Sequence, residues 1–540
     1  MPRPSIARAA GLALLLGGLA VADPPRPADD LLTVAERSGF RATARHAEVV
    51  ALCDRLAKAS PGFIRSGELG RSVEGRSLPL LIVADPPVAT PEEARRSGKL
   101  VVLLFGNIHA GEVCGKEALP ILAREVAATP GHPLLKHLVL VVAPILNADG
   151  NERVSKDNRP GQVGPEQGMG RRANASGLDL NRDFMKLEAP ETRALARFLD
   201  DWDPALVIDT HTTNGSHHRY TITYEGPKNP AGDRRLIAYA RGKMFPEVGA
   251  AFEKATGFRS FFYGNFEGDH ARWTSFPATP RFGTTYIGLR NRLSVLSEAY
   301  SYAPYETRIR ATREFCLACL RFAADHRDEI RALLDDARRT TVEAGRDPRP
   351  EDRVAIRSEA RTFPGKATVL GFVEREEGGK TVATDRPKDY ACDLEQDFVP
   401  TLEVPRPFAY LIPREYARAV ETIRAHGIRA EALDGDTLLD VEVEAIIAFD
   451  RSRTPTEGHE TIQVRSSKTT RLARTVPAGT IVVRTSQPLG TLAVYLLEPR
   501  SDDGLATWNF FDDALADGRN RDFPVARITR RIAMATTPIP

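Results

Sequence analysis

The feature that most constrains the fold is an alternation of short apolar runs with helical patterns. The runs 100–105, 138–145 and 205–209 are rich in β-branched residues and too short for helices, so they predict buried strands. Helical patterns lie between them at 112–128 and 190–201. The order strand, helix, strand, helix, strand is typical of an α/β sheet built from crossover connections. A strand pair at 63–85, a last strand at 293–300 and a long helix at 304–337 complete this prediction.

The length of 540 residues predicts two to four domains, at about 100–200 residues each. The polar segment 340–352, with Pro348 and Pro350, is the predicted boundary between a main domain, 23–340, and an accessory domain of unknown role, 341–540. Short alternating runs and one helix at 414–426 indicate that the accessory domain is smaller and α+β or mostly β. The predicted strands there are 369–373, 408–412, 441–448, 480–483 and 492–497. An aromatic cluster at 508–512 either covers part of the main domain or packs in a local core. The local core is the favoured interpretation.

The N-terminus has the pattern of an export signal. Arg3 and Arg8 precede the apolar run Ala9–Ala22, which ends in small residues. The run is shorter than the roughly 20 residues that span a bilayer. We therefore expect residues 1–22 to be a signal peptide cleaved near Ala22, and the mature protein to be secreted or periplasmic without a stable membrane anchor.

Charge and cysteine content exclude two further classes of protein. The chain has 74 basic and 72 acidic residues. Removal of residues 1–22, which hold two arginines and no acid, leaves no formal net charge, so a protein that coats nucleic acid is not expected. Five cysteines are too few for a disulfide scaffold.

Metal-ligand residue types follow two of the predicted strands. His109 and Glu112 lie at the turn after strand 100–105, and His211 follows strand 205–209. Two imidazoles and a carboxylate with an open fourth position are typical of catalytic zinc. His326 and Glu329 have the same spacing but lie inside a charged helical pattern. The spacing alone therefore does not identify metal ligands, whereas the position of His109 and Glu112 at the end of a strand favours them as ligands.

Six ordered motifs between His109 and Glu298 resemble the metallocarboxypeptidase family, the carboxypeptidase A/B-like zinc peptidases. They are Gly106-x-x-His109-x-Gly111-Glu112, Asn147-Ala148-Asp149-Gly150, Arg171-Arg172-Ala173-Asn174, Gly177 to Phe184 (GLDLNRDF), Asp209-Thr210-His211-Thr212 and Leu293 to Glu298 (LSVLSE). The resemblance implies a zinc carboxypeptidase-like catalytic domain with a mixed, largely parallel twisted sheet and helices on both faces. Two departures are Asp183, where the family more usually has Asn, and the spacing of 87 residues between His211 and Glu298.

The resemblance also implies residue roles. One zinc ion would be held by His109, Glu112 and His211, and Glu298 would be the general base. Asn181 and Arg182 would bind the C-terminal carboxylate of the substrate. One of Arg171 or Arg172 would polarise the scissile carbonyl, and Asp179 would orient His109. Asp209 is an alternative for a similar orienting role. The implied activity is that of an exported zinc-dependent exopeptidase, which hydrolyses the C-terminal bond of a peptide with a free carboxylate by zinc-activated water.

Three alternatives stay open at this point. The first is a zinc N-acyl amino acid deacylase or a peptidoglycan-peptide amidase, which would share the zinc ligands. The second is a non-catalytic peptide-binding protein on a peptidase fold. The third is thiol catalysis by Cys114, which is disfavoured because a metal-bound His109 is unavailable as a base. Tyr286 and Tyr300 are the candidates for a tyrosine that caps the substrate.

Overall fold

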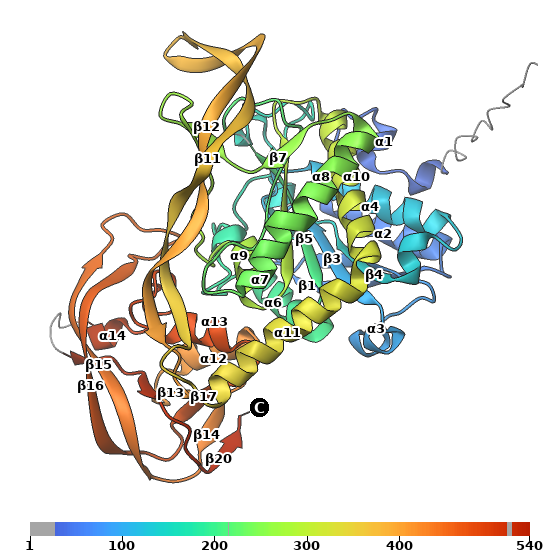
Figure 1. Cartoon of the computed structure of the whole chain (residues 1–540). Helices are drawn as coiled ribbons and strands as arrows, with labels where there is room; N and C mark the ends of the chain where they lie inside the picture. Colours follow the sequence, from blue (N-terminus) through green and yellow to red (C-terminus); the bar gives the residue numbers. More distant parts are fainter. Residues whose placement is uncertain (1–27, 214, 516–520, 540) are drawn as a thin grey trace, which may run out of the picture.

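An eight-stranded mixed sheet forms the centre of the N-terminal part of the chain (Figure 1). The computed structural model describes residues 28–213, 215–515 and 521–539, and the predicted signal peptide lies outside these ranges. The strand order is β1-β2-β4-β3-β5-β10-β6-β7. The strands are β1 (Ile64–Arg71), β2 (Ser77–Val83), β3 (Leu100–Gly106), β4 (Leu138–Ala143), β5 (Leu206–Thr213), β6 (Ile222–Glu225), β7 (Ser260–Phe262) and β10 (Leu293–Tyr300). Strands β4, β3, β5 and β10 are parallel, whereas β2 and β6 run antiparallel to their neighbours β4 and β10. The predicted mixed, largely parallel sheet is confirmed.

Helices cover both faces of this sheet. Helix α4 (Cys114–Ala128) packs on one face together with α10 (Tyr305–Asp325). Helix α4 lies very close to β5, because a Cβ at Gly115 of α4 would lie 2.0 Å from Thr210 Oγ1 of β5. Side chains alternate along a strand, so Asp209 and His211 of β5 point to the opposite face. Helix α9 (Gly283–Leu289) lies there, where Ser294 Oγ of β10 donates a hydrogen bond to the Thr284 carbonyl at 2.7 Å.

The remaining helices of this part include the one expected at 190–201 and several that the sequence pattern did not indicate. They are α1 (Val34–Arg37), α2 (His46–Ala59), α3 (Pro91–Ser97), α5 (Ala148–Glu152), α6 (Pro190–Trp202), α7 (Arg234–Tyr239), α8 (Phe245–Thr256) and α11 (Arg327–Arg346). The single long helix expected at 304–337 is two helices, α10 and α11, which meet at His326. Helix α11 runs past residue 341 to Arg346, and the division of the chain at that residue stays a prediction.

The C-terminal part contains two further sheets. Strands β11 (Arg353–Glu377) and β12 (Lys380–Pro405) form a long ribbon that extends along the N-terminal part (Figure 1). Strand β12 pairs with β9 (Arg272–Thr274), which in turn pairs with β8 (Asn265–Glu267). A third, antiparallel sheet has the order β16-β15-β19-β13-β17-β14-β20, and β18 pairs with β15. Its strands are β13 (Ala409–Ile412), β14 (Glu431–Leu433), β15 (Thr437–Arg451), β16 (Ile462–Val476), β17 (Ile481–Arg484), β18 (Arg521–Asp522), β19 (Ala526–Ile528) and β20 (Thr536–Pro538). The mostly-β expectation is confirmed.

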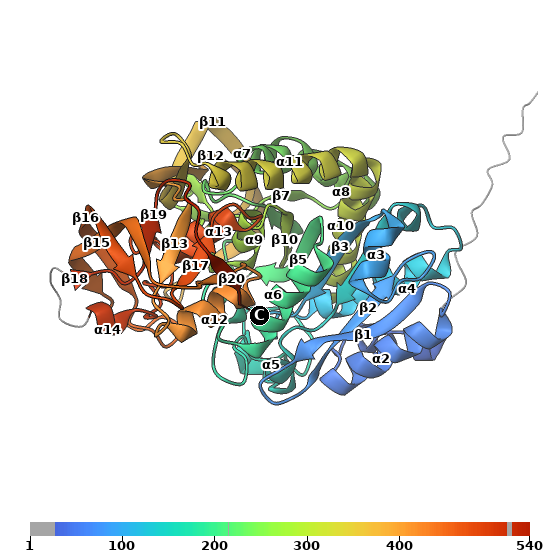
Figure 2. The same cartoon turned by 90° about the horizontal axis from the view of Figure 1, so that it is seen from below.

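Helices α12 (Ala417–Ala425), α13 (Gly490–Leu497) and α14 (Asp512–Leu515) accompany the third sheet, and α12 contacts α6 of the N-terminal part (Figure 2). The strand predicted at 492–497 is wrong, because this run is helix α13. Every residue of α13 is buried, so its apolar run carries no helical period.

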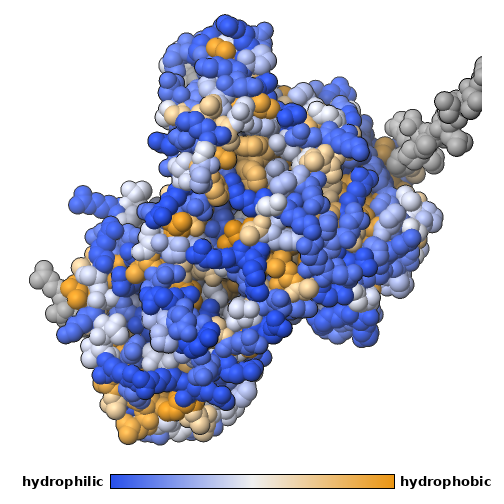
Figure 3. Space-filling view, in the orientation of Figure 1, coloured by the Kyte–Doolittle hydropathy of each residue, from blue (hydrophilic) through white to orange (hydrophobic). Residues whose placement is uncertain are grey.

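The surface shown in Figure 3 is largely hydrophilic, and one group of apolar side chains lies at the lower end, over the third sheet. In the part of the chain that the structure describes, no helix is long and apolar enough to cross a membrane.

His426 lies at the junction of the two parts and makes stability depend on pH. Its Nδ1 lies 2.8 Å from Tyr286 Oη, and its Nε2 lies 3.2 Å from the Met185 carbonyl oxygen. Burial lowers the pKa of His426 to about 3. The unfolded chain therefore binds a proton below about pH 6.5 that the folded chain does not bind, and stability falls as the pH decreases from there.

We expect His426 to contribute a loss of about 2 kcal/mol in the free energy of unfolding between pH 7.5 and pH 5. His426→Gln keeps an acceptor and a donor at these positions but does not titrate. Urea unfolding of both proteins at the two pH values measures the difference. An equal loss of stability in the variant and the wild type would contradict the prediction.

Candidate metal centre and active site

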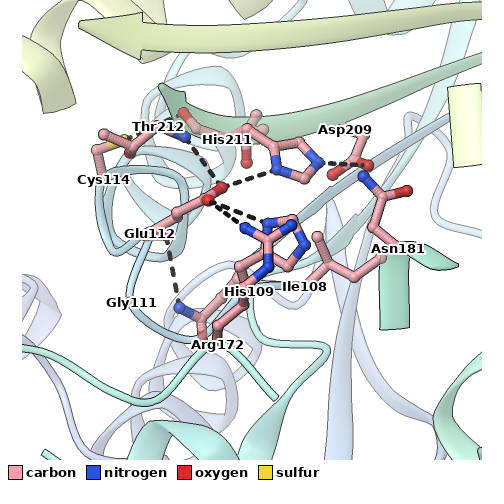
Figure 4. A network of polar contacts seen from close by, with 12 residues as sticks. Ile108, His109, Gly111, Glu112, Cys114, Arg172, Asn181, Asp209, His211 and Thr212 are labelled. Carbon is pink, nitrogen blue, oxygen red and sulfur yellow. Dashed lines mark hydrogen bonds and ion pairs between the residues drawn. The ribbon is translucent and has the colours of Figure 1, made fainter. Parts of the chain in front are cut away.

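The three predicted metal ligands converge at the carboxyl ends of β3 and β5 (Figure 4). His109 and Glu112 lie in the turn between β3 and α4, and His211 lies within β5, which continues to Thr213 rather than ending at residue 209. His109 Nδ1 lies 3.0 Å from Glu112 Oε1, and His211 Nδ1 lies 2.7 Å from Glu112 Oε2. All three side chains are buried, and their ligand atoms lie within 4.8 Å of one another.

A second carboxylate lies against the far nitrogen of each histidine. His109 Nε2 is 3.0 Å from Asp179 Oδ1, and His211 Nε2 is 2.8 Å from Asp209 Oδ2. A carboxylate at Nε2 fixes the ring and directs Nδ1 toward the common point. The sequence offered Asp179 and Asp209 as alternatives, whereas the structure places one of them on each ring.

An arginine that the sequence did not indicate adjoins the ligand set. Arg159 Nη2 forms an ion pair with Glu112 Oε1, and its Nη1 donates to the Thr212 carbonyl at 3.2 Å. Burial alone would raise the pKa of Glu112, but Arg159 and the two histidines hold it well below its usual range. Glu112 is therefore ionised, as a metal ligand must be. Arg159 follows a 3-10 turn in an irregular segment between β4 and α6, where no pattern pointed to it.

A pocket of about 210 Å³ opens over these residues. Its lining comprises His109, Glu112, Arg172, Asn181, Arg182, His211, Thr212, Thr213, Tyr263, Phe276, Phe282, Thr284, Leu296 and Glu298. Glu298 is opposite His211 in the parallel pairing of β10 with β5, so both side chains point to the same face. Its enclosure raises the pKa of Glu298 to about 8. Among the described residues its Oε2 has no hydrogen-bond partner.

The two adjacent arginines, Arg171 and Arg172, are placed differently relative to the pocket. Arg172 lines the pocket, its Nε donates to Asp179 Oδ2 at 2.8 Å, and its Nη1 lies 3.7 Å from Glu112 Oε1. Arg171 is exposed and is not among the lining residues. Of the two candidates, only Arg172 is therefore placed beside the ligand set.

Asn181 and Arg182 line the same pocket from a short 3-10 turn, Leu180–Arg182. Asp179 caps this turn by accepting from Asn181 N at 2.9 Å. Asn181 Oδ1 accepts from Gly283 N at 2.8 Å, and the Arg182 guanidinium lies over the Phe282 ring at 4.3 Å. The guanidinium is thus held at the pocket wall.

Comparison with known proteins identifies a family for part of the chain. Residues 49–257 match the family model described as zinc carboxypeptidase. The chain carries a metallocarboxypeptidase domain. Carboxypeptidase 2 of Trichophyton tonsurans is 23% identical over 492 residues, which cover 88% of this chain and 84% of that protein. Human carboxypeptidase D is 34% identical over 180 residues, or 28% of this chain and 13% of that protein. The solved carboxypeptidase A of Helicoverpa armigera has a TM-score of 0.40 at 19% identity and covers 52% of this chain and 74% of its own.

The predicted family is thereby confirmed, and the metallocarboxypeptidase domain is a peptide hydrolase. Members of the matched family depend on zinc. The donor set fits that metal, because two imidazole nitrogens and a carboxylate face a common point and each ring is held by a second carboxylate. Among the residues that the structure describes, these three form the one group of three or more His, Cys, Asp or Glu that suits a metal ion. His326 and Glu329, the pair with the same spacing, form a surface ion pair 3.2 Å apart.

The metallocarboxypeptidase pocket contains a tyrosine other than the two expected. Tyr263, between β7 and β8, lines the pocket, and burial raises its pKa to about 12, so it is a neutral phenol. Tyr286 is buried against His426, and the ring of Tyr300 is tilted against that of His218, with the ring centroids 4.5 Å apart. Neither lines the pocket. Tyr263 belongs to an aromatic run, Phe261 to Tyr263, in which the sequence alone does not distinguish it from core residues.

Thiol catalysis finds no support in the metallocarboxypeptidase site. Cys114 is buried, and its Sγ lies 3.0 Å from Thr212 Oγ1 and 3.7 Å from the His211 carbonyl oxygen, neither of which is a base. All five cysteines are buried and free of disulfides.

Proposed function

We propose that this chain is an exported zinc-dependent exopeptidase that removes C-terminal residues from peptides with a free carboxylate. One observation carries the proposal: Asn181 and Arg182 line the same pocket as the three candidate ligands and Glu298. A guanidinium binds a carboxylate through two parallel hydrogen bonds, which suits the end of a peptide. The pocket volume of about 210 Å³ is below the roughly 300–1,000 Å³ of pockets that enclose drug-sized ligands, and this supports recognition of a terminal residue.

Each residue of the site has a distinct task in this proposal. His109, Glu112 and His211 would hold one zinc ion. A bound zinc would polarise the scissile carbonyl and lower the pKa of water at the site to about 7. Glu298 accepts the proton of the attacking water at its carboxylate and gives it to the leaving amine. Arg172 donates to the oxygen that becomes negative, and Asn181 with Arg182 orients the terminal carboxylate.

The proposed export depends on residues 1–22, which lie outside the described residues. Their basic start and their apolar run of fewer than 20 residues support a cleaved signal peptide and not a membrane anchor.

Removal of the metal tests the zinc dependence. We expect exhaustive chelation to lower kcat on a free-carboxylate peptide at least about 100-fold, because Lewis-acid stabilisation is worth several kcal/mol. One equivalent of zinc per chain should restore it. The measurement is peptide hydrolysis together with metal content by elemental analysis. Full activity in protein shown to hold no metal would contradict the proposal.

A zinc N-acyl amino acid deacylase is the second candidate, because an N-acyl amino acid also ends in a carboxylate and suits a pocket of about 210 Å³. A peptidoglycan-peptide amidase shares the ligands but needs no terminal carboxylate. Product analysis on tetrapeptides beside N-acetyl amino acids separates these reactions. We do not propose a non-catalytic binding protein, because the matched family consists of hydrolases and the ligands and base are all present.

A further inference from the structure

A tight turn of the C-terminal part reaches the active site. Strands β15 and β16 are joined by residues 452–461, in which Thr456 and His459 exchange two backbone hydrogen bonds of 2.9 Å. The two residues between them, Glu457 and Gly458, have positive φ angles of 51° and 82°. This is a two-residue hairpin turn whose first position favours Asn, Asp or Gly. We call residues Thr456–His459 the Glu457 turn.

The glutamate of this turn contacts the residue that orients His109. Glu457 Oε2 accepts a hydrogen bond from Asp179 N at 2.7 Å. The Asp179 carboxylate in turn lies against His109 Nε2, Arg172 Nε and Asn181 N at 3.0, 2.8 and 2.9 Å. The backbone position of Asp179 therefore sets the positions of three pocket residues at once, and Glu457 holds it from the other side.

Further contacts fix the Glu457 turn on the N-terminal part. His459 Nε2 lies 3.0 Å from Glu188 Oε2, and His459 Nδ1 lies 2.9 Å from Asn509 Oδ1. Asn509 Nδ2 donates to the Glu460 carbonyl at 3.0 Å. These bonds attach the turn to both parts of the chain, so Glu457 is not a free surface side chain.

A second group of contacts lies beside the pocket, at Arg281. Arg281 forms an ion pair of 2.9 Å with Asp503, and its guanidinium lies 4.7 Å from the Trp508 ring. Arg281 directly precedes Phe282, which lines the pocket. The aromatic cluster at 508–512 thus covers part of the N-terminal part as well as packing locally, and the C-terminal part contacts two adjacent segments of the pocket lining.

We propose that Glu457 is a positioning residue of the peptidase site: through Asp179 it holds the segment Asp179–Arg182 in place for catalysis. This inference rests on the proposed function, in which Asp179 orients a zinc ligand and Arg182 binds substrate. It also accounts for a glutamate in a left-handed conformation, since unfavourable backbone conformations persist where the surrounding structure or function requires them. Asparagine would suit the turn better, but its side chain is one methylene shorter and does not reach Asp179 N.

Two variants distinguish the effect of the hydrogen bond between Glu457 and Asp179 from the effect of the turn conformation. Glu457→Asn relieves the left-handed glutamate and removes the contact, so we expect an unchanged or higher Tm but a fall in kcat/KM of about 3- to 10-fold and a similarly faster release of zinc to a chelator. Glu457→Gln keeps the length and an acceptor oxygen, so its kcat/KM should stay within about twofold of wild type. The control is Asp269→Gly, at another positive φ of 53° on an exposed turn, which should leave kcat/KM and zinc release unchanged.

The outcomes distinguish this inference from the proposed function. Wild-type kcat/KM and zinc release in Glu457→Asn would overturn the inference and leave the function standing. A lowered Tm in Glu457→Asn, or an equal fall in Glu457→Gln, would also overturn it, because the first indicates a structural role and the second makes the oxygen contact irrelevant. If wild type hydrolyses no peptide, the proposed function fails, and zinc release then decides: faster release from Glu457→Asn supports the inference, and equal release overturns it.

Discussion

Glu298→Gln should abolish turnover while zinc binding and folding persist. A general base contributes about 10²- to 10⁴-fold to the rate, and we expect kcat to fall by that factor because an amide cannot accept the proton of the attacking water. Glutamine has the same shape as glutamate. Enclosure raises the pKa of Glu298 to about 8, so in the metal-free protein at neutral pH the substitution exchanges one neutral group for another. No buried charge is removed, and the fold has no reason to change.

The measurements are kcat on a free-carboxylate peptide, zinc per chain and Tm. Glu247→Gln is the matched control, since this exposed carboxylate pairs with His326 on the surface, at 3.1 Å. It should match wild type in all three. If Glu298→Gln turns over at the wild-type rate with zinc bound, Glu298 is not the base. If it loses zinc together with activity, its role is in metal retention, which the proposal does not give it.

The convergence of the three candidate zinc ligands was predictable because secondary structure places them. Apolar runs that predict strands precede His109, Glu112 and His211. Parallel strands bring their carboxyl ends to one edge of a sheet. Glu298 was predictable for the same reason, since β10 is the parallel neighbour of β5. The sequence could not decide between Arg171 and Arg172, because adjacent residues in an irregular segment have no periodicity to orient them.

Residues that reach the site through tertiary contacts were not predictable. Arg159 and Tyr263 come from segments without a pattern, and Glu457 contacts Asp179 across 278 positions of sequence. Only the packing of the C-terminal part against the N-terminal part brings Glu457 and Asp179 together.

Three elements of the C-terminal part were misassigned, missed or predicted only in part, for local reasons. An entirely buried apolar run such as α13 has neither the helical nor the strand period, so its type is ambiguous. Strands β11 and β12, of 25 and 26 residues, are far longer than the usual 5–6, and their polar, exposed stretches hide the alternation that marks a strand.

Arg182→Met should remove the preference for a free C-terminal carboxylate. In wild type the guanidinium is held over Phe282 at 4.3 Å at the pocket wall, where it is partly shielded from water. Loss of one partner of such a charge pair costs about 2–5 kcal/mol, so kcat/KM on the acid should fall roughly 30- to 5,000-fold. The C-terminal amide carries no charge for Arg182 to bind, and its slow hydrolysis should change less than about threefold.

The readout is the ratio of kcat/KM for a peptide acid and its amide, which cancels any general damage to the site. Arg182→Lys keeps the charge but not the planar fork, so its ratio should lie between those of wild type and Arg182→Met. Arg327→Met, on the exposed start of α11, should keep the wild-type ratio. If Arg182→Met still discriminates acid from amide, the carboxylate is bound by another group, and the exopeptidase proposal loses the observation on which it rests.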